Sequence, residues 1–160
     1  MKQTVKIFVA LWMLMYALNC TAFVLTMYSK GISVSFEEGK FELSAREQSR
    51  LIKLIEHQSD FSTLNIFLVI AHGDKVSDDV NRNFQAMLAG ARANEINSFY
   101  AEHAASEFHG LIRTFTEPIK SGSQMDQAGR AEVVIEGFCK PGNDAVCREH
   151  WPPSQTMERE

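Results

Sequence analysis

The sequence predicts an α+β protein: a two-layer α/β sandwich with the element order βαβαββ, preceded by a transmembrane helix. Short apolar runs alternate with helical patterns along residues 32–138, and one long uncharged run occupies the N-terminus. A chain of 160 residues is also long enough for one domain with a core. This order of elements places both helices on one face of a single sheet.

The N-terminal run from Ile7 to Ser29 contains no Asp, Glu, Lys, Arg or His. A helix needs about 20 apolar residues to cross the hydrocarbon core of a membrane. We therefore expect residues 1–30 to form an uncleaved signal anchor. Lys2 and Lys6 precede the run, which places the N-terminus in the cytoplasm and the rest of the chain outside.

Two alternatives for this segment stay open. A cleaved signal peptide has a shorter apolar centre, of about 7 to 15 residues, and the apolar character here continues through Met27. An outer-membrane lipoprotein would be acylated at Cys20, but Asn19 stands where a lipobox pattern has a small residue.

The first strand and helix after the anchor have clear sequence signals. Residues 32–36 alternate apolar and polar side chains, as in a half-buried strand. Ser44 and Glu47 have the spacing of a capping box, in which the hydroxyl and the carboxylate each accept a bond from an otherwise unpaired amide. The helix is expected from Ala45 to His57.

The second strand is expected from Leu64 to His72, because this nearly continuous apolar run is typical of a central strand. Apolar residues at helical spacing then predict a second helix that ends near Ala104. Its N-terminal cap is expected among three residues, Ser77, Asp78 and Asp79.

The remaining part of the chain contains two further apolar segments. Strands are predicted at Leu111–Phe115 and Ala131–Phe138, and the polar segment between them is predicted to be a loop. Residues 139–160 are expected to form a disulfide loop and then a mobile tail. The domain proper is accordingly expected to cover residues 31–138.

Cys139 and Cys147 flank a Pro-Gly-Asn turn that can bring them together. An exported chain would be expected to join them in a disulfide. Two free thiols are one alternative. A zinc site with His150 is another, although a fourth ligand and the usual cysteine spacing are missing.

Composition and motifs argue against several functional classes. A net charge of -4 provides no basic surface for a phosphate backbone, so no nucleic-acid partner is expected. No nucleophile motif and no phosphate-binding glycine loop occur, so we expect no enzymatic activity and no cofactor. His72 and Asp74 could bind a metal only with further ligands, and no metal site is predicted.

Several phrases of the sequence are similar to one family. "SVSFEEGKFELSAREQ", "LVIAHGDKV", "LAGARANEINSFY", "FTEP" and "GRAEVVI" occur in the order of corresponding phrases in the OmpA-like peptidoglycan-binding domain. Residues 31–138 thus resemble this domain over essentially its whole length.

The resemblance implies recognition of the diaminopimelate residue in the peptide stem of peptidoglycan. It places the carboxylate that receives the ligand's ammonium group at Asp74, and the guanidinium that receives its carboxylate at Arg92. Such a pair suits a zwitterionic ligand, because guanidinium binds carboxylate in a bidentate manner. Asp78, Asp79 and Arg130 are further candidates for ligand binding.

The chain also departs from the family pattern. Gly73 replaces a threonine, Ser77 replaces a glycine, Gln85 replaces an asparagine, and Ala131 replaces the second arginine of an Asn-Arg-Arg phrase. Asp74 and Arg92 lie 18 residues apart, about three more than in the family.

Together these features predict an inner-membrane-anchored envelope protein whose periplasmic domain binds peptidoglycan non-covalently. The alternative is a structural subunit of a multi-protein envelope complex, such as a secretion or conjugation apparatus, in which the domain contacts other envelope proteins.

Overall fold

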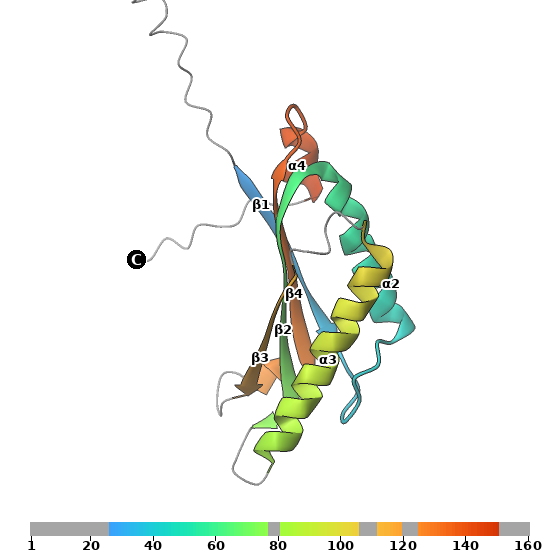
Figure 1. Cartoon of the computed structure of the whole chain (residues 1–160), viewed down its shortest axis with the longest axis vertical. Coiled ribbons are helices and arrows are strands. Elements are labelled where there is room, and N and C mark those ends of the chain that lie inside the picture. The colour runs from blue at the N-terminus through green and yellow to red at the C-terminus, as the bar shows by residue number, and fades with distance from the viewer. Residues whose placement is uncertain (1–25, 77–80, 106–111, 120–124, 151–160) are drawn as a thin grey trace, which may run out of the picture.

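The computed structural model describes residues 26–76, 81–105, 112–119 and 125–150. These residues form a four-stranded mixed sheet with two long helices on the same side of it (Figure 1). The predicted two-layer arrangement is therefore confirmed for the described part of the chain.

The sheet has the strand order β1-β4-β2-β3. β1 (Met27–Ser35) and β2 (Phe61–Val76) both pair antiparallel with β4 (Arg130–Cys139), while β3 (Ile112–Ile119) pairs parallel with β2. β2 and β4 are thus central, and β1 and β3 are the two edge strands.

Two helices cover the sheet, and shorter ones connect or end its strands. α2 (Ala45–Glu56) has Ser44 as its N-cap, whose Oγ accepts from the Glu47 amide at 3.3 Å. The capping box is half formed, because the Glu47 carboxylate binds Arg50 instead of returning to the cap. The second long helix is α3 (Arg82–His103), and the short helical segments of the described residues are η1 (His57–Asp60), η3 (Met125–Gln127) and α4 (Asp144–His150).

The predicted N-terminal cap of the second long helix was wrong. α3 begins at Arg82, after Asn81, and not directly after the acidic residues 78 and 79. The Asn81 side chain makes no capping bond to the helix and donates to the Val76 carbonyl at 3.1 Å. It therefore ties the start of α3 to the end of β2.

All four strands of the sheet are longer than the sequence pattern predicted, and both edge strands show this clearly. β1 begins at Met27 and not at residue 32, and Tyr28 near its start is buried opposite Gly137. β3 continues to Ile119, through the start of the segment predicted to be a loop, because its pairing with β2 persists there. Hydrogen bonding to a neighbouring strand extends these segments beyond the residues with an alternating apolar pattern.

The anchor predicted for residues 1–30 lies almost entirely outside the described residues. Among the residues that are described, no helix is long and apolar enough to cross a membrane. Met27–Ser29, the last three residues of the uncharged run, belong to β1. Residues 7–26 precede the strand and still have the length, about 20 residues, that a membrane helix needs.

The hydrophobic core lies between the sheet and the two long helices. Phe67 of β2 and Tyr100 of α3 stack with ring centroids 3.7 Å apart, and Gln58 donates to the Tyr100 hydroxyl at 2.8 Å. Burial raises the pKa of Tyr100, partly offset by that hydrogen bond. The core is completed by buried apolar side chains of all layers, including Val34, Leu51, Leu54, Val69, Ile96, Ala131, Val133 and Ile135.

Cys139 at the end of β4 and Cys147 in α4 form a disulfide. Their Cα atoms are 6.3 Å apart, and Cys147 is fully buried. Since bonded cysteines cannot act as thiolate ligands, the alternative zinc site is excluded. Residues Asp144–His150 therefore form a helix that the disulfide fastens to the end of the sheet.

We expect loss of this disulfide to destabilise the domain. The chain-entropy model gives about 2.5 kcal/mol for a bridge that spans 8 residues. Chemical denaturation should show this loss in a Cys139→Ala/Cys147→Ala variant. A reductant should lower the stability of the parent protein and leave that of the variant unchanged. Equal stability of the parent protein and the variant without reductant would contradict the prediction.

Candidate functional site

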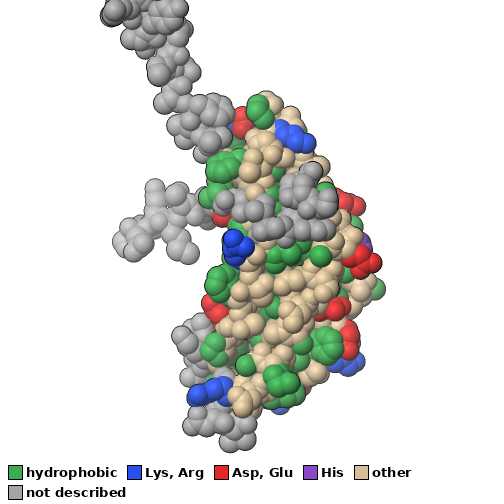
Figure 2. All heavy atoms as spheres, in the orientation of Figure 1, with side chains coloured by type: hydrophobic (Ala, Val, Ile, Leu, Met, Phe, Trp, Pro, Cys, Tyr) green, Lys and Arg blue, Asp and Glu red, His purple; other side chains and the backbone are tan. Residues whose placement is uncertain are grey.

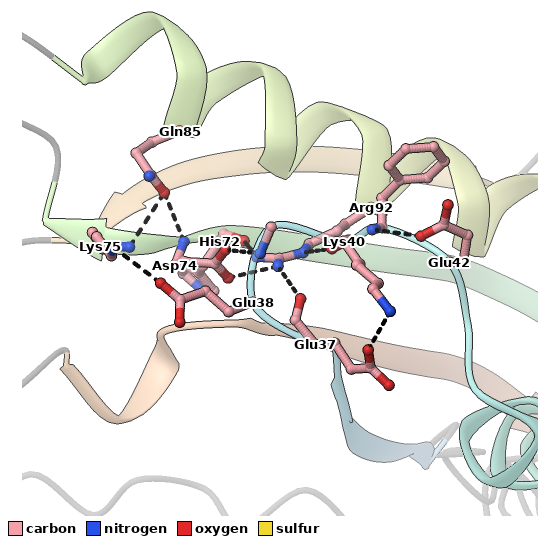
Figure 3. Close-up of polar contacts among 11 residues, drawn as sticks. Glu37, Glu38, Lys40, Glu42, His72, Asp74, Lys75, Gln85 and Arg92 are labelled. Carbon is pink, nitrogen blue, oxygen red and sulfur yellow. Dashed lines mark hydrogen bonds and ion pairs between the residues drawn. The ribbon is translucent and has the colours of Figure 1, made fainter.

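Asp74 lies near the end of β2, where the regular pairing with β3 is interrupted. His72 pairs with Glu117, but the next pair is Val76 with Ile119, so β2 contains extra residues between these positions. Irregularities of this kind redirect side chains away from the regular ladder. The irregular segment contains Asp74, whose carboxylate lies against Arg92 (Figure 3).

Arg92 projects from the middle of α3 and is fully buried. Its Nη2 is 2.6 Å from Asp74 Oδ1, and the guanidinium lies over the Phe36 ring at 5.1 Å. It also donates three bonds to backbone carbonyls: Nη1 to His72 at 2.9 Å, Nε to Lys40 at 2.9 Å, and Nη2 to Glu37 at 3.2 Å. Arg92 thus joins α3, β2 and the segment after β1.

The Asp74 carboxylate is also bonded by the protein itself. One oxygen accepts from Arg92 and the other from the Gly39 amide at 2.6 Å. Its side chain is 7% exposed, and that of Arg92 is 0% exposed. The sequence-predicted pair is therefore brought together as a direct ion pair, and neither partner is open to solvent.

The Glu37–Lys40 loop closes the site on its solvent side (Figure 3). All four of its residues are exposed, and Gly39 has the positive φ of 72° that favours glycine. Its side chains form surface ion pairs, Lys40 with Glu37 and Lys75 with Glu38. Hydrogen bonding and charge in these pairs lower the pKa of Glu37 and raise the pKa of both Lys40 and Lys75.

Gln85, in the first turn of α3, holds the backbone around Asp74. Its Oε1 accepts from the Asp74 amide at 2.7 Å and from the Lys75 amide at 3.2 Å. A Cβ atom at Gly73 would overlap this Oε1 and come within 3.2 Å of the Gln85 carbonyl oxygen. Glycine at 73 therefore makes room for glutamine at 85.

A pocket of about 540 Å³ opens beside the pair. Gly73 and Gln85, which adjoin Asp74, form part of its wall together with Val76, Arg82 and Ile119, whereas Asp74 and Arg92 do not line it. This volume lies within the usual range for small-molecule sites, roughly 300 to 1,000 Å³.

The other predicted site residues do not join the pair. Asp78 and Asp79 lie outside the described residues, as does Cys20. Arg130 follows Gly129, where an added Cβ atom would lie 3.5 Å from Asp74 Oδ1, but the Arg130 side chain is exposed and makes no ion pair within the described chain. No cluster of three or more His, Cys, Asp or Glu that could bind a metal occurs among the described residues.

The sequence pattern did not identify two parts of the site. The Glu37–Lys40 loop has no motif that indicates a role in the site, although its Glu-Glu-Gly-Lys sequence indicates a tight turn. In the sequence Gln85 is only a departure from the family pattern, because its contact with Gly73 depends on the position of α3 over β2. On the face seen in Figure 2, the Lys and Arg side chains of the described residues are scattered and form no continuous basic patch.

No protein-family model matches the sequence, and no curated protein matches it. Solved structures do match. The OmpA-like domain of FopA1 from Francisella tularensis has a TM-score of 0.59 at 13% identity, over 74% of this chain and 79% of that chain.

Two further matches have lower scores, and the fold assignment does not depend on them. The peptidoglycan-associated lipoprotein from Burkholderia pseudomallei has a TM-score of 0.49 at 14% identity, over 64% of this chain and 88% of that chain. The periplasmic domain of MotB from Helicobacter pylori has a TM-score of 0.49 at 10% identity, over 79% of this chain and 86% of that chain.

The sheet order, the two helices on one face and the likeness to FopA1 define an α/β sandwich of OmpA-like type. The chain has the fold of an OmpA-like domain, with low sequence identity to the domain it matches, and the fold predicted from the sequence is confirmed.

Proposed function

We propose that this protein is a membrane-anchored envelope protein whose OmpA-like domain binds peptidoglycan non-covalently, through the diaminopimelate residue of the peptide stem. The observation that carries this proposal is the contact between Asp74 and Arg92 at 2.6 Å. It brings together one carboxylate and one guanidinium, the two groups needed to bind the zwitterionic end of an amino acid.

Binding would replace the ion pair by two ligand contacts. The ammonium group of diaminopimelate takes the place of Arg92 on Asp74, and its carboxylate takes the place of Asp74 on Arg92. Because both side chains are closed off by the Glu37–Lys40 loop, this exchange requires the loop to move away. The adjacent pocket then provides space for the rest of the stem peptide.

The disulfide and the N-terminal run support a location outside the cytoplasm. Disulfides persist mainly in oxidising compartments, such as the periplasm. The uncharged run before β1 has the length of an inner-membrane anchor, and acylation at Cys20 remains the alternative for an outer-membrane location. We propose a binding role and not a catalytic one.

The second candidate function is that of a structural subunit of an envelope complex, with other envelope proteins as partners. It is favoured by the closure of the site: Arg92 uses four N–H groups within the protein and is fully buried. It is also favoured by the start of β1 at Met27, because a helix over residues 7–26 would leave no linker between membrane and domain.

Binding to purified sacculi separates the two functions. A fragment of residues 26–160 keeps all of β1, whereas one starting at residue 31 would remove its first four residues. We expect the fragment to sediment with diaminopimelate-type sacculi and to be released by free diaminopimelate. Sacculi with lysine at the same position of the stem should bind it at least about tenfold more weakly, because lysine lacks the second carboxylate.

Asp74→Asn tests the site, and Asp144→Asn is its matched control. Asp144 is an exposed acid at the start of α4, at the other end of the sheet (Figure 1). We expect Asp74→Asn to weaken binding about tenfold or more, as removal of one charged partner does, and Asp144→Asn to have no effect. Circular dichroism must show that both variants are folded. If the parent fragment does not bind sacculi, the structural role is favoured.

A further inference from the structure

We propose that two copies of this chain associate through the free edges of their β3 strands, in antiparallel register with Phe115 opposite Phe115. The resulting assembly would be a continuous eight-stranded sheet with a two-fold axis at Phe115. This inference does not rest on peptidoglycan binding, because Asp74 and Arg92 lie outside β3, although Thr116 and Glu117 of β3 also line the pocket beside that pair.

The first observation is the open edge. β3 pairs with β2 on one side only, and no other described strand pairs with its outer side. Six consecutive residues, 113–118, are exposed. An edge strand of this kind presents unpaired N–H and C=O groups that can pair with another strand, except that Pro118, near its end, has no N–H to donate.

The second observation concerns which side chains share a face of β3. Asn97 of α3 donates to the Thr114 hydroxyl at 2.8 Å, so Thr114 lies on the face covered by the helices. Since side chains alternate along a strand, Arg113, Phe115 and Glu117 lie on the opposite face. Phe115 is 55% exposed, a large apolar side chain without a cover among the described residues.

The third observation is that this row of side chains is complementary to itself. In an antiparallel pair centred on Phe115, Arg113 of each copy lies opposite Glu117 of the other, and the two Phe115 rings meet at the axis. Thr114 then lies opposite Thr116 on the other face. One strand thus provides two opposite-charge pairs and an aromatic pair, which is the isologous contact that a two-fold dimer needs.

The charges of Arg113 and Glu117 have an alternative explanation. Edge strands often carry charged residues that prevent pairing with another chain. A protective edge repels a second copy, whereas Arg113 and Glu117 have opposite signs at equal distances from Phe115. The second copy is therefore the occupant that the charges fit best.

Reversing these charges tests the proposal in the full chain, purified in density-matched detergent and studied by analytical ultracentrifugation. Arg113→Glu alone, or Glu117→Arg alone, places like charges opposite each other twice per dimer. Each should weaken the dimer about fivefold to thirtyfold. The double variant Arg113→Glu/Glu117→Arg restores opposite charges and should restore the parent's association to within about threefold.

Cysteine crosslinking tests the register. Phe115→Cys should give a covalent dimer on mild oxidation, because residues opposite each other have Cβ atoms about 5 Å apart. Asn94→Cys, at an exposed position of α3, should give no more crosslinking than the parent chain. A monomeric parent chain, a dimer insensitive to both single reversals, or a double variant as weak as the single ones would overturn the proposal.

Discussion

Replacing Arg92 by alanine is expected to lower the free energy of unfolding by about 3 to 5 kcal/mol. The substitution leaves the Asp74 carboxylate buried without its cation, and it removes the donors from the carbonyls of Glu37, Lys40 and His72. A loss of this size is a large fraction of the total stability of an ordinary domain, which is roughly 5 to 15 kcal/mol. Urea denaturation of residues 26–160 measures it.

Arg130→Ala is the matched control for this experiment. Arg130 is the other arginine that the sequence predicted for the site, but it is exposed and makes no ion pair among the described residues. We expect a change within about 0.5 kcal/mol. Arg92→Lys should recover only part of the lost stability. Lysine has a single ammonium nitrogen, and it lacks the planar fork of N–H groups with which the guanidinium reaches its four acceptors. A stability of Arg92→Ala within about 1 kcal/mol of the parent would show that the pair is not a structural element.

The fold was largely predictable because its signals are local. The apolar alternation of residues 32–36, the helical spacing after Ser44 and the apolar run before His72 each identify an element without reference to the rest of the chain. The strand ends were not predictable in this way. Tyr28 and Pro118 belong to strands because neighbouring strands continue past them, which is a property of the sheet and not of the local sequence.

The proximity of Asp74 and Arg92 was predictable from the sequence, whereas the closure of the loop over the pair was not. The longer interval between Asp74 and Arg92 does not keep them apart, because their side chains are in contact at 2.6 Å. The sequence could not show that the Glu37–Lys40 loop closes over the pair. That closure uses backbone groups, the Gly39 amide and two carbonyls, and backbone groups leave no residue-type signal.

Two departures from the family pattern are explained by one contact. The family's threonine is Gly73 here and its asparagine is Gln85, and in the structure these two positions touch. The longer glutamine reaches the amides of Asp74 and Lys75, and it occupies the space that a side chain at 73 would need. Threonine at 73 beside glutamine at 85 would overlap, and glycine at 73 beside the shorter asparagine at 85 would leave a gap. The two changes are therefore expected to depend on each other.

A double-mutant cycle at these positions tests this dependence. Gly73→Thr alone should destabilise the fragment by about 2 to 3 kcal/mol, because the new side chain displaces Gln85 from two backbone amides in a site that is already filled. Gln85→Asn alone should cost less, about 1 kcal/mol, since it shortens the side chain without creating an overlap. The double variant Gly73→Thr/Gln85→Asn should be more stable than the sum of the single effects predicts, by about 1 kcal/mol or more. Chemical denaturation of the four proteins gives the coupling energy. Strictly additive effects would mean that Gly73 and Gln85 are independent, and the close contact between β2 and α3 would then have no part in the divergence of this site.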